Sequence, residues 1–246
     1  MKTYRYILSL ILFVFLTSGA HLGFSAGWGD IVKGAQEALG GKETLSNDEI
    51  IQGLKEALQV GTENAVKLVS RPDGYYKDPE IKIPLPESVQ KVEKLLRAIG
   101  YGDKVDSFEL SMNRAAERAA PEAKSIFWDA ITRMTFDDAK KILNGRDNEA
   151  TLYFEDKTSD RLQAIFKPIV KDTMGDVGVT QSFQDLNAKA ESMPFGKSLS
   201  FDLDQYVTDG ALKGLFKMLA EEEKQIRTQP AARVTDLLKK VFAGKN

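Results

Sequence analysis

Cysteine does not occur in this sequence of 246 residues, and histidine occurs once, as His21. Without cysteine the chain cannot form disulfides, thiolate zinc sites, iron–sulfur clusters or a cysteine nucleophile. His21 lies at the edge of a segment that we expect to be removed. The mature chain then also lacks the base of a Ser-His-Asp triad and the usual ligand for zinc or haem iron. We therefore expect no cofactor and no metal site.

The sequence also lacks an excess of charge of either sign. It has 34 Lys and Arg residues against 36 Asp and Glu residues, a net charge of −2. Nucleic-acid-binding proteins carry a basic patch or stripe, so we expect no nucleic-acid partner. With 42% hydrophobic residues, a chain of this length can bury a core large enough to fold without disulfides or metal ions.

The first 26 residues resemble a secretory signal peptide. Lys2 and Arg5 precede an apolar run, Ile7–Leu16, which is too short to span a bilayer because spanning takes about 20 apolar residues. Small residues favour cleavage after Ala20, with Ala26 as the alternative. We expect an exported protein, periplasmic or otherwise, and an uncleaved membrane anchor is the competing interpretation.

Residues 27–45 form a glycine-rich N-terminal lead. Its apolar residues recur at helical spacing, which allows a short amphipathic helix that docks on the main body or touches a membrane surface. They are Trp28, Ile31, Val32, Ala35 and Leu39. We expect any membrane contact to be made through residues 1–39.

Hydrophobic periodicity predicts an all-α fold for residues 46–243, a single multi-helical bundle domain of eight to ten helices. Ser46, and Thr135 with Asp138, are N-capping signals, and Gly100 and Gly145 are stop signals. The predicted helices cover residues 46–69, 87–99, 103–120, 121–134, 135–144, 148–157, 159–175, 180–191, 209–227 and 230–243, with a kink at Pro168.

One long Pro-rich extended loop, Arg71–Pro86, interrupts this pattern, because four prolines and Gly74 exclude a helix. Its start, Pro72-Asp73-Gly74, predicts a tight turn. Ile81-Lys82-Ile83 alternates like a short strand, which the neighbouring prolines confine to a sheet edge or an extended loop. Long loops are often functional, but we expect this one to be a strap laid over the helical core.

Residues 192–207 form a second irregular passage, after which Thr208 is the predicted cap of the next helix. Asp202 and Asp204 suggest a calcium loop, but Tyr206 and Val207 occupy positions that need an oxygen ligand and a glycine. Further along, Glu221-Glu222-Glu223 with Lys224 and Arg227 predicts a solvated helix face carrying i,i+4 ion pairs.

The bundle is predicted to be organised around residues 103–144. The first helix of this stretch has a face at the spacing of a buried stripe, and four of its five residues are small or flexible: Phe108, Met112, Ala115, Ala116 and Ala119. A polar row, Glu109, Asn113 and Glu117, lies beside this stripe at i, i+4 and i+8. Ser111, Arg114 and Arg118 lie on the other flank.

The polar row is the candidate catalytic site. Successive helical turns place Glu109, Asn113 and Glu117 about 6 Å apart, near enough for two carboxylates to share a proton or a cation, as glycosidases require. The alternative is that both glutamates form structural ion pairs, which are commoner than catalytic pairs.

Candidate binding residues cluster around the Pro-rich loop and the flank of the row. Arg71 beside Tyr75 and Tyr76 could bind an acidic group with aromatic support, or it could bond its own turn. Arg114 and Arg118 supply further positive charge.

Several strings together resemble the bacterial family known as domain of unknown function 4197. They are LSNDEIIQGLKEAL, RPDGYY, IKIPLP, LNGRDNEATLYFEDKTS, YVTDGALKGLFKMLAEEEKQIR and PAARVTDLLKKVF, and the similarity covers Leu45 to Phe242. The resemblance implies an exported, all-α bacterial protein. It implies no reaction and transfers no catalytic residue.

Three functional hypotheses remain open. The first is a non-enzymatic binding or structural module of the cell envelope, whose partner is another envelope protein or an apolar small ligand. The second is a carboxylate-dependent hydrolase that uses Glu109 and Glu117. The third is a membrane-surface protein held by its N-terminal segment.

Overall fold

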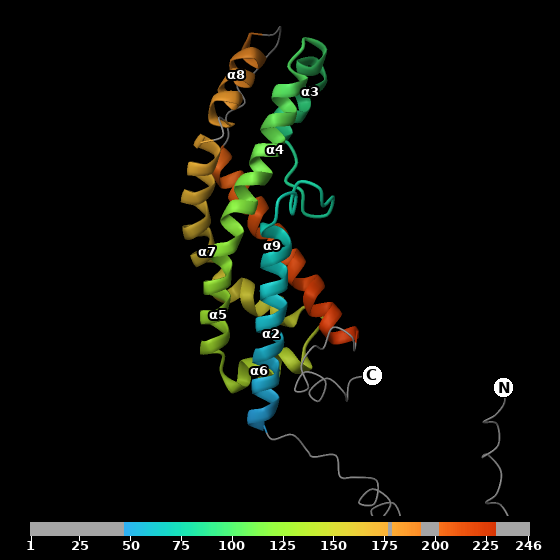
Figure 1. The fold of residues 1–246 in the computed structure, drawn as a ribbon, viewed down its shortest axis with the longest axis vertical. Helices are drawn as coiled ribbons and strands as arrows, with labels where there is room; N and C mark the ends of the chain where they lie inside the picture. The colour runs from blue at the N-terminus through green and yellow to red at the C-terminus, as the bar shows by residue number, and fades with distance from the viewer. Residues whose placement is uncertain (1–46, 177–178, 193–201, 230–246) are drawn as a thin grey trace, which may run out of the picture. The chain divides into compact units, whose positions relative to one another are not determined.

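A computed structural model describes residues 47–176, 179–192 and 202–229. These residues form eight α-helices, one 3-10 helix and no strand (Figure 1), which confirms the all-α prediction. The helices are α2 (Asn47–Ser70), α3 (Glu87–Ala98), α4 (Gly102–Ala119), η1 (Ala120–Glu122), α5 (Ala123–Arg133), α6 (Phe136–Asn144), α7 (Glu149–Asp176), α8 (Val179–Glu191) and α9 (Leu203–Thr228).

The predicted signal peptide, the glycine-rich lead, Ser46 and the last predicted helix lie outside the described residues. Within these residues no helix is both long enough and apolar enough to cross a membrane.

Helix α4 lies at the centre of the bundle and contacts α2, α3, α7, α8 and α9. Its predicted stripe is confirmed, since Phe108, Met112, Ala115, Ala116 and Ala119 have no exposed surface. The alanines let neighbouring backbones approach closely, and large side chains of other helices fill the space between them. Phe154, Phe166 and Leu162 of α7 belong to the same core.

Local capping signals define several boundaries as expected. Thr135 and Asp138 form a capping box at the start of α6, and Gly145 follows its last residue. Gly100 follows α3 with a φ of +88°, in the region that favours glycine. Pro121 is the second residue of the 3-10 helix η1, which begins at Ala120 and leads into α5.

Two predicted boundaries are wrong. The predicted helices 148–157 and 159–175 are one helix, α7, because the hydroxyls of Thr158 and Ser159 donate to carbonyls one turn back (both 2.6 Å) and start no new helix. Helix α9 begins at Leu203, inside the predicted irregular passage. Its cap is Asp202, which accepts from the Gln205 N–H at 2.9 Å.

Residues 71–86 connect α2 to α3 without a helix, as predicted, and are called the strap below. In Figure 1 the strap is the teal segment beside α4. The turn at its start is confirmed, because the Gly74 N–H donates to the Arg71 carbonyl at 2.9 Å. Ile81–Ile83 does not form the predicted strand. The N–H groups of Ile81 and Lys82 donate to the Asp78 carbonyl in a turn, and the Ile83 backbone pairs with a side chain of α4.

Candidate functional site

The strap is attached to α4 by the side-chain amide of Asn113, which is fully buried. Its Oδ1 accepts from the Ile83 N–H at 2.8 Å, and its Nδ2 donates to the Ile83 carbonyl at 2.9 Å. Nδ2 also donates to the Glu109 carbonyl at 2.9 Å. The amide therefore takes the place of a neighbouring β-strand and pairs with both backbone groups of one residue.

Glu117 holds the other end of the strap. Its carboxylate is 5% exposed and accepts from the N–H groups of Tyr75 (3.1 Å) and Tyr76 (3.4 Å). Arg114 pairs with its second oxygen at 2.5 Å. Two backbone donors and one cation therefore occupy both oxygens of this buried carboxylate, which gives it a structural role.

Arg114 also reaches the turn of the strap. Its second nitrogen lies 2.5 Å from Asp73, which in turn pairs with Lys77 at 2.7 Å. Asp73 adopts a φ of +65°, a left-handed conformation that aspartate tolerates better than most residues. Lys77, and then Arg114, hold the pKa of Asp73 below its ordinary value.

Glu109, the first residue of the polar row, pairs with Lys82 of the strap at 2.7 Å. The same ammonium lies over the ring of Tyr76, 4.6 Å from its centroid. Each carboxylate of the row thus has a cation of its own. Glu109, Asn113 and Glu117 all bind the strap, and these three residues with Arg114 are called its mount below. The two carboxylates that were predicted to act as a pair make separate structural contacts.

The opposite face of the strap packs on α9. The ring of Tyr75 is completely buried, and its hydroxyl donates to the Ala211 carbonyl at 2.6 Å. Burial raises the pKa of this hydroxyl far above its ordinary value, so the group stays a neutral donor.

Two glycines of α9 make this packing possible, and sequence reasoning missed them. A Cβ on Gly214 would lie 2.5 Å from Cε1 of Tyr75, and one on Gly210 would lie 3.0 Å from Cγ1 of Ile83. Glycine within a helix costs about 1 kcal/mol. Two glycines one helical turn apart could therefore have indicated, from the sequence, that another segment packs against this helix.

A groove of about 390 Å³ runs between the strap and α9. Its lining residues are Glu80, Ile81, Lys82, Ile83 and Pro84 from the strap and Tyr206, Asp209, Gly210, Lys213, Gly214 and Lys217 from α9. Its size lies at the lower end of the range for small-molecule sites. An apolar floor with a polar rim is the usual composition of such sites.

Most charges around this groove have partners. Lys217 pairs with Glu80 at 2.6 Å, which holds the pKa of Glu80 below its ordinary value. Asp209 accepts from Gln205 (2.7 Å) and Gln163 (3.0 Å). Tyr206 closes one end by donating to the Pro84 carbonyl at 3.1 Å.

The remaining predicted binding residues do not form one site. Arg71 is exposed, but the buried Tyr75 ring cannot support a ligand beside it. Tyr76 belongs to the strap and Arg114 to its mount. Arg118 is exposed on α4.

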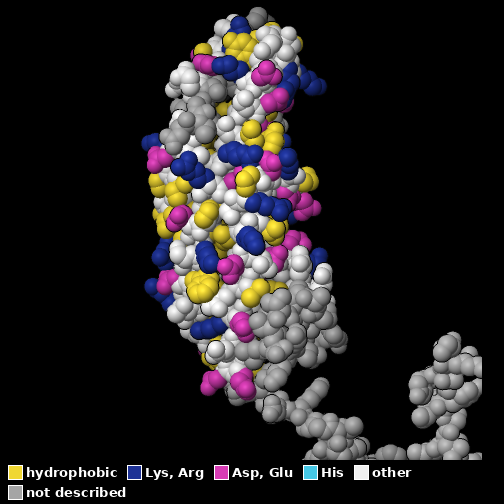
Figure 2. All heavy atoms as spheres, in the orientation of Figure 1, with side chains coloured by type: hydrophobic (Ala, Val, Ile, Leu, Met, Phe, Trp, Pro, Cys, Tyr) yellow, Lys and Arg dark blue, Asp and Glu magenta, His cyan; other side chains and the backbone are white. Residues whose placement is uncertain are grey.

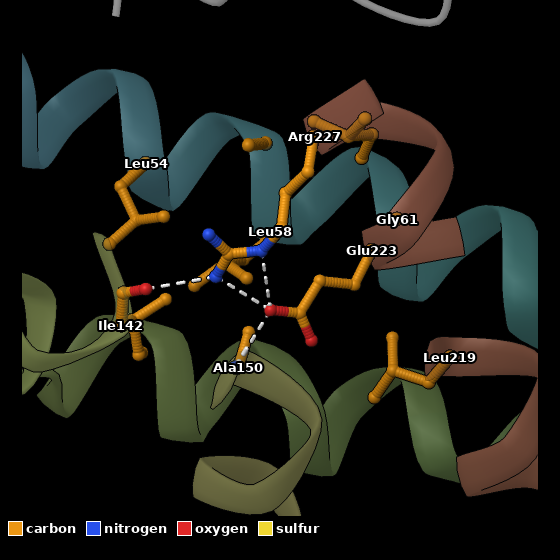
Figure 3. A pocket seen from close by; sticks show the side chains of 10 residues that line it. Leu54, Leu58, Gly61, Ile142, Ala150, Leu219, Glu223 and Arg227 are labelled. Carbon is orange, nitrogen blue, oxygen red and sulfur yellow. Dashed lines mark hydrogen bonds and ion pairs between the residues drawn. The ribbon is translucent and has the colours of Figure 1, made fainter. Parts of the chain in front are cut away.

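A second, much smaller cavity of about 20 Å³ lies where α2, α6, α7 and α9 meet (Figure 3). Its polar wall is the pair Glu223 and Arg227, 2.7 Å apart. Glu223 accepts from the N–H groups of Ala150 and Thr151 at 2.9 Å, and Arg227 donates to the Ile142 carbonyl at 2.8 Å. In Figure 3 the guanidinium lies between that carbonyl and the carboxylate.

This pair corrects the prediction of a solvated face. The predicted i,i+4 contact exists, but Glu223 is only 7% exposed and Glu222 is also buried. The carboxylate lies over the N-terminus of α7, where it complements the helix dipole. A cavity of this volume holds about one water molecule, so we interpret it as part of the helix packing.

No group of three or more acidic or histidine side chains suited to a metal ion occurs in the part of the chain that the structure describes. On the face shown in Figure 2, charged side chains of both signs alternate with apolar ones.

Comparison with curated proteins and with solved structures gives no match. The model of one family, described as protein of unknown function DUF4197, matches residues 44–243. That range contains all the described helices, the strap and the groove. The chain therefore belongs to the DUF4197 family.

Proposed function

We propose that this protein is an exported, non-enzymatic binding module of the bacterial cell envelope, and that the groove between the strap and α9 is its binding surface. The observation that carries the proposal is the groove itself. The groove combines an apolar floor, a rim that carries lysines and a volume of about 390 Å³. The signal-like N-terminus supports the envelope location.

The geometry of the strap favours binding over catalysis. A ligand site must be held in shape before the ligand arrives. The strap is fixed on one side by Asn113 and Glu117 and on the other by the Tyr75 hydroxyl. These contacts use the carboxylates that a hydrolase would need, and they leave the groove as the surface that a partner can reach.

Native mass spectrometry of the mature protein, purified gently from the periplasm of its host, tests this proposal. We expect a population that carries extra mass from a bound ligand. Lys213→Trp should remove it, because an indole at this exposed lining position would fill part of the groove. The matched control is Lys224→Trp, an exposed lysine on the same helix outside the groove, which should keep it. A bare wild-type protein would contradict the proposal.

The hydrolase hypothesis makes the opposite claim about α4. Glu109→Gln and Glu117→Gln variants that remain folded should keep the ligand if the row is a mount. A reaction catalysed by the wild-type protein and abolished in both folded variants would restore the enzyme interpretation. The membrane-surface hypothesis depends on residues 1–39, and release of the mature protein by osmotic shock tests it.

A further inference from the structure

We propose that one face of α3 is a self-association surface, through which two copies of this protein form a two-fold symmetric dimer. The surface consists of the apolar pair Leu95 and Ile99, with Lys91 before it and Asp103 after it in the chain. It shares no residue with the groove, so the inference goes beyond the proposed function. In Figure 1, α3 and α8 lie at one end of the helical bundle and α6 lies at the other.

The apolar pair is the observation from which the inference starts. Leu95 is 49% exposed, and Ile99, directly after the end of α3, is 42% exposed. Four positions separate them, so both lie on one side of the helix, one turn apart. The other side of α3 is already buried through Val89 and Leu96. Exposed apolar side chains that lie together, with charged residues around them, mark surfaces that another molecule covers.

The remaining exposed large apolar residues among those described, Trp128 and Phe136, do not form such a pair. Trp128 lies in α5, and Phe136 is the first residue of α6. The Lys124 ammonium lies over the ring of Trp128, 5.9 Å from its centroid, so this ring already has a partner within the protein.

Several charges close to the apolar pair are satisfied within the protein. Arg97 binds Glu93 at 2.9 Å and Asp106 at 2.6 Å. Lys104 binds Asp185 of α8 at 3.2 Å. These groups are therefore not the ones that a partner would meet first.

Four other charges of this region have no such partner. Glu87, Lys91, Lys94 and Asp103 are exposed, and none of them forms an ion pair within residues 47–176, 179–192 and 202–229. Two are acidic and two are basic, so together they select neither an anionic nor a cationic ligand. A second copy of the same surface is the partner that this balance fits, because in a two-fold dimer an acid of each copy can meet a base of the other.

A two-fold axis at position 97 pairs the surface with itself. Leu95 and Ile99 each lie two positions from Arg97, and Lys91 and Asp103 each lie six positions from it. With the two α3 helices antiparallel, Leu95 of one copy packs on Ile99 of the second copy. Lys91 of one copy then faces Asp103 of the second copy. An axis at Leu95 would place Lys91 against Ile99 instead, so the charges favour the first register.

Disulfide trapping tests this contact directly, because the protein has no cysteine of its own. Ala98→Cys places a single thiol on the exposed side of α3, next to the proposed axis. We expect the mature variant to form a disulfide-linked dimer when it is oxidised. Lys140→Cys is the control, since Lys140 is an exposed residue of α6, at the other end of the bundle, and this variant should stay monomeric.

Sedimentation velocity on charge variants tests the register. Interfaces below about 1,200 Å² are typical of weak association, so the mature protein is measured at concentrations up to about 1 mM. Lys91→Glu and Asp103→Lys each place like charges opposite one another, and each should weaken the dimer by about tenfold. The double variant exchanges the two signs and should recover most of the affinity. Lys140→Glu, with the same change of charge outside the surface, should associate as the wild type does.

A wild-type protein that stays monomeric up to about 1 mM would overturn the inference. So would a dimer that both single charge variants leave unchanged, or equal trapping of Ala98→Cys and Lys140→Cys. If the single variants weaken the dimer and the double variant does not recover it, Lys91 and Asp103 do not face each other and the proposed register is wrong.

Discussion

Asn113 is the residue on which the position of the strap depends most. Its amide is buried and pairs with both backbone groups of Ile83. Asn113→Ala leaves a buried donor and a buried acceptor without partners, at about 1–3 kcal/mol each. We expect the free energy of unfolding to fall by about 3 kcal/mol in urea titrations.

Ser107→Ala is the matched control for this change, because Ser107 is exposed on the same helix. It should change stability by less than about 0.5 kcal/mol. Equal stability of Asn113→Ala and the wild type would show that the strap is not held by this amide.

Gly214 supplies the space for the Tyr75 ring. A methyl group there would lie 2.5 Å from Cε1 of Tyr75 and 3.1 Å from Cβ of Ile81, so Gly214→Ala should lower the thermal midpoint, with overpacking costing about 1–3 kcal/mol. Gly175→Ala is the contrasting change. Gly175 lies in α7 with nothing within 4 Å of the added atom, so this substitution should stabilise by up to about 1 kcal/mol. The two should shift the midpoint in opposite directions.

Asp73 makes the strap sensitive to acid. Its folded-state pKa lies below the ordinary value of 3.8, because Lys77 and Arg114 favour the charged form. The charged carboxylate stabilises the folded protein above pH 4, and this contribution is lost as pH falls through the lowered pKa. Asp73→Asn should therefore be less stable at pH 7 and lose less stability below pH 4. Asparagine also tolerates the positive φ, so the change isolates the charge. An unchanged acid profile would contradict this account.

At the scale of the helices, the pair Glu223 and Arg227 connects α9 to α6 and α7. The carboxylate binds the start of α7, and the guanidinium binds the end of α6. Glu223→Gln removes the charge of the carboxylate that pairs with Arg227 in a largely buried place, and breaking such a pair costs about 3 kcal/mol. Chemical denaturation should show this loss.

Glu221→Gln is the control for Glu223→Gln, since Glu221 lies on the same helix and is less buried. It should be nearly neutral. If both variants unfold at the same urea concentration, the Glu223 contact does not contribute to stability.

The helices themselves could be predicted because their signals are local. The apolar stripe of α4, the capping box at Thr135 and the turn at Pro72 each depend on residues within a few positions of one another. The merged helix α7 escaped prediction because Thr158 and Ser159 look like caps but bond within the helix. Tertiary packing decides between these two uses.

At the scale of the whole molecule, the site depends on contacts between distant residues. Tyr75 lies 42 positions from Glu117 and 136 positions from Ala211. The sequence showed the polar row and the loop as separate features, and it could not show that one holds the other. For the same reason Glu223 looked solvated, because its partners Ala150 and Thr151 lie 73 and 72 positions away.

The central claim is that α4 mounts the strap and that a ligand binds on the strap's other face, against α9. A crystal structure of the mature protein as isolated from the periplasm, without refolding, tests this claim most directly. We predict ligand density in the groove between residues 80–84 and α9. Density between Glu109 and Glu117, with the strap displaced, would contradict the claim.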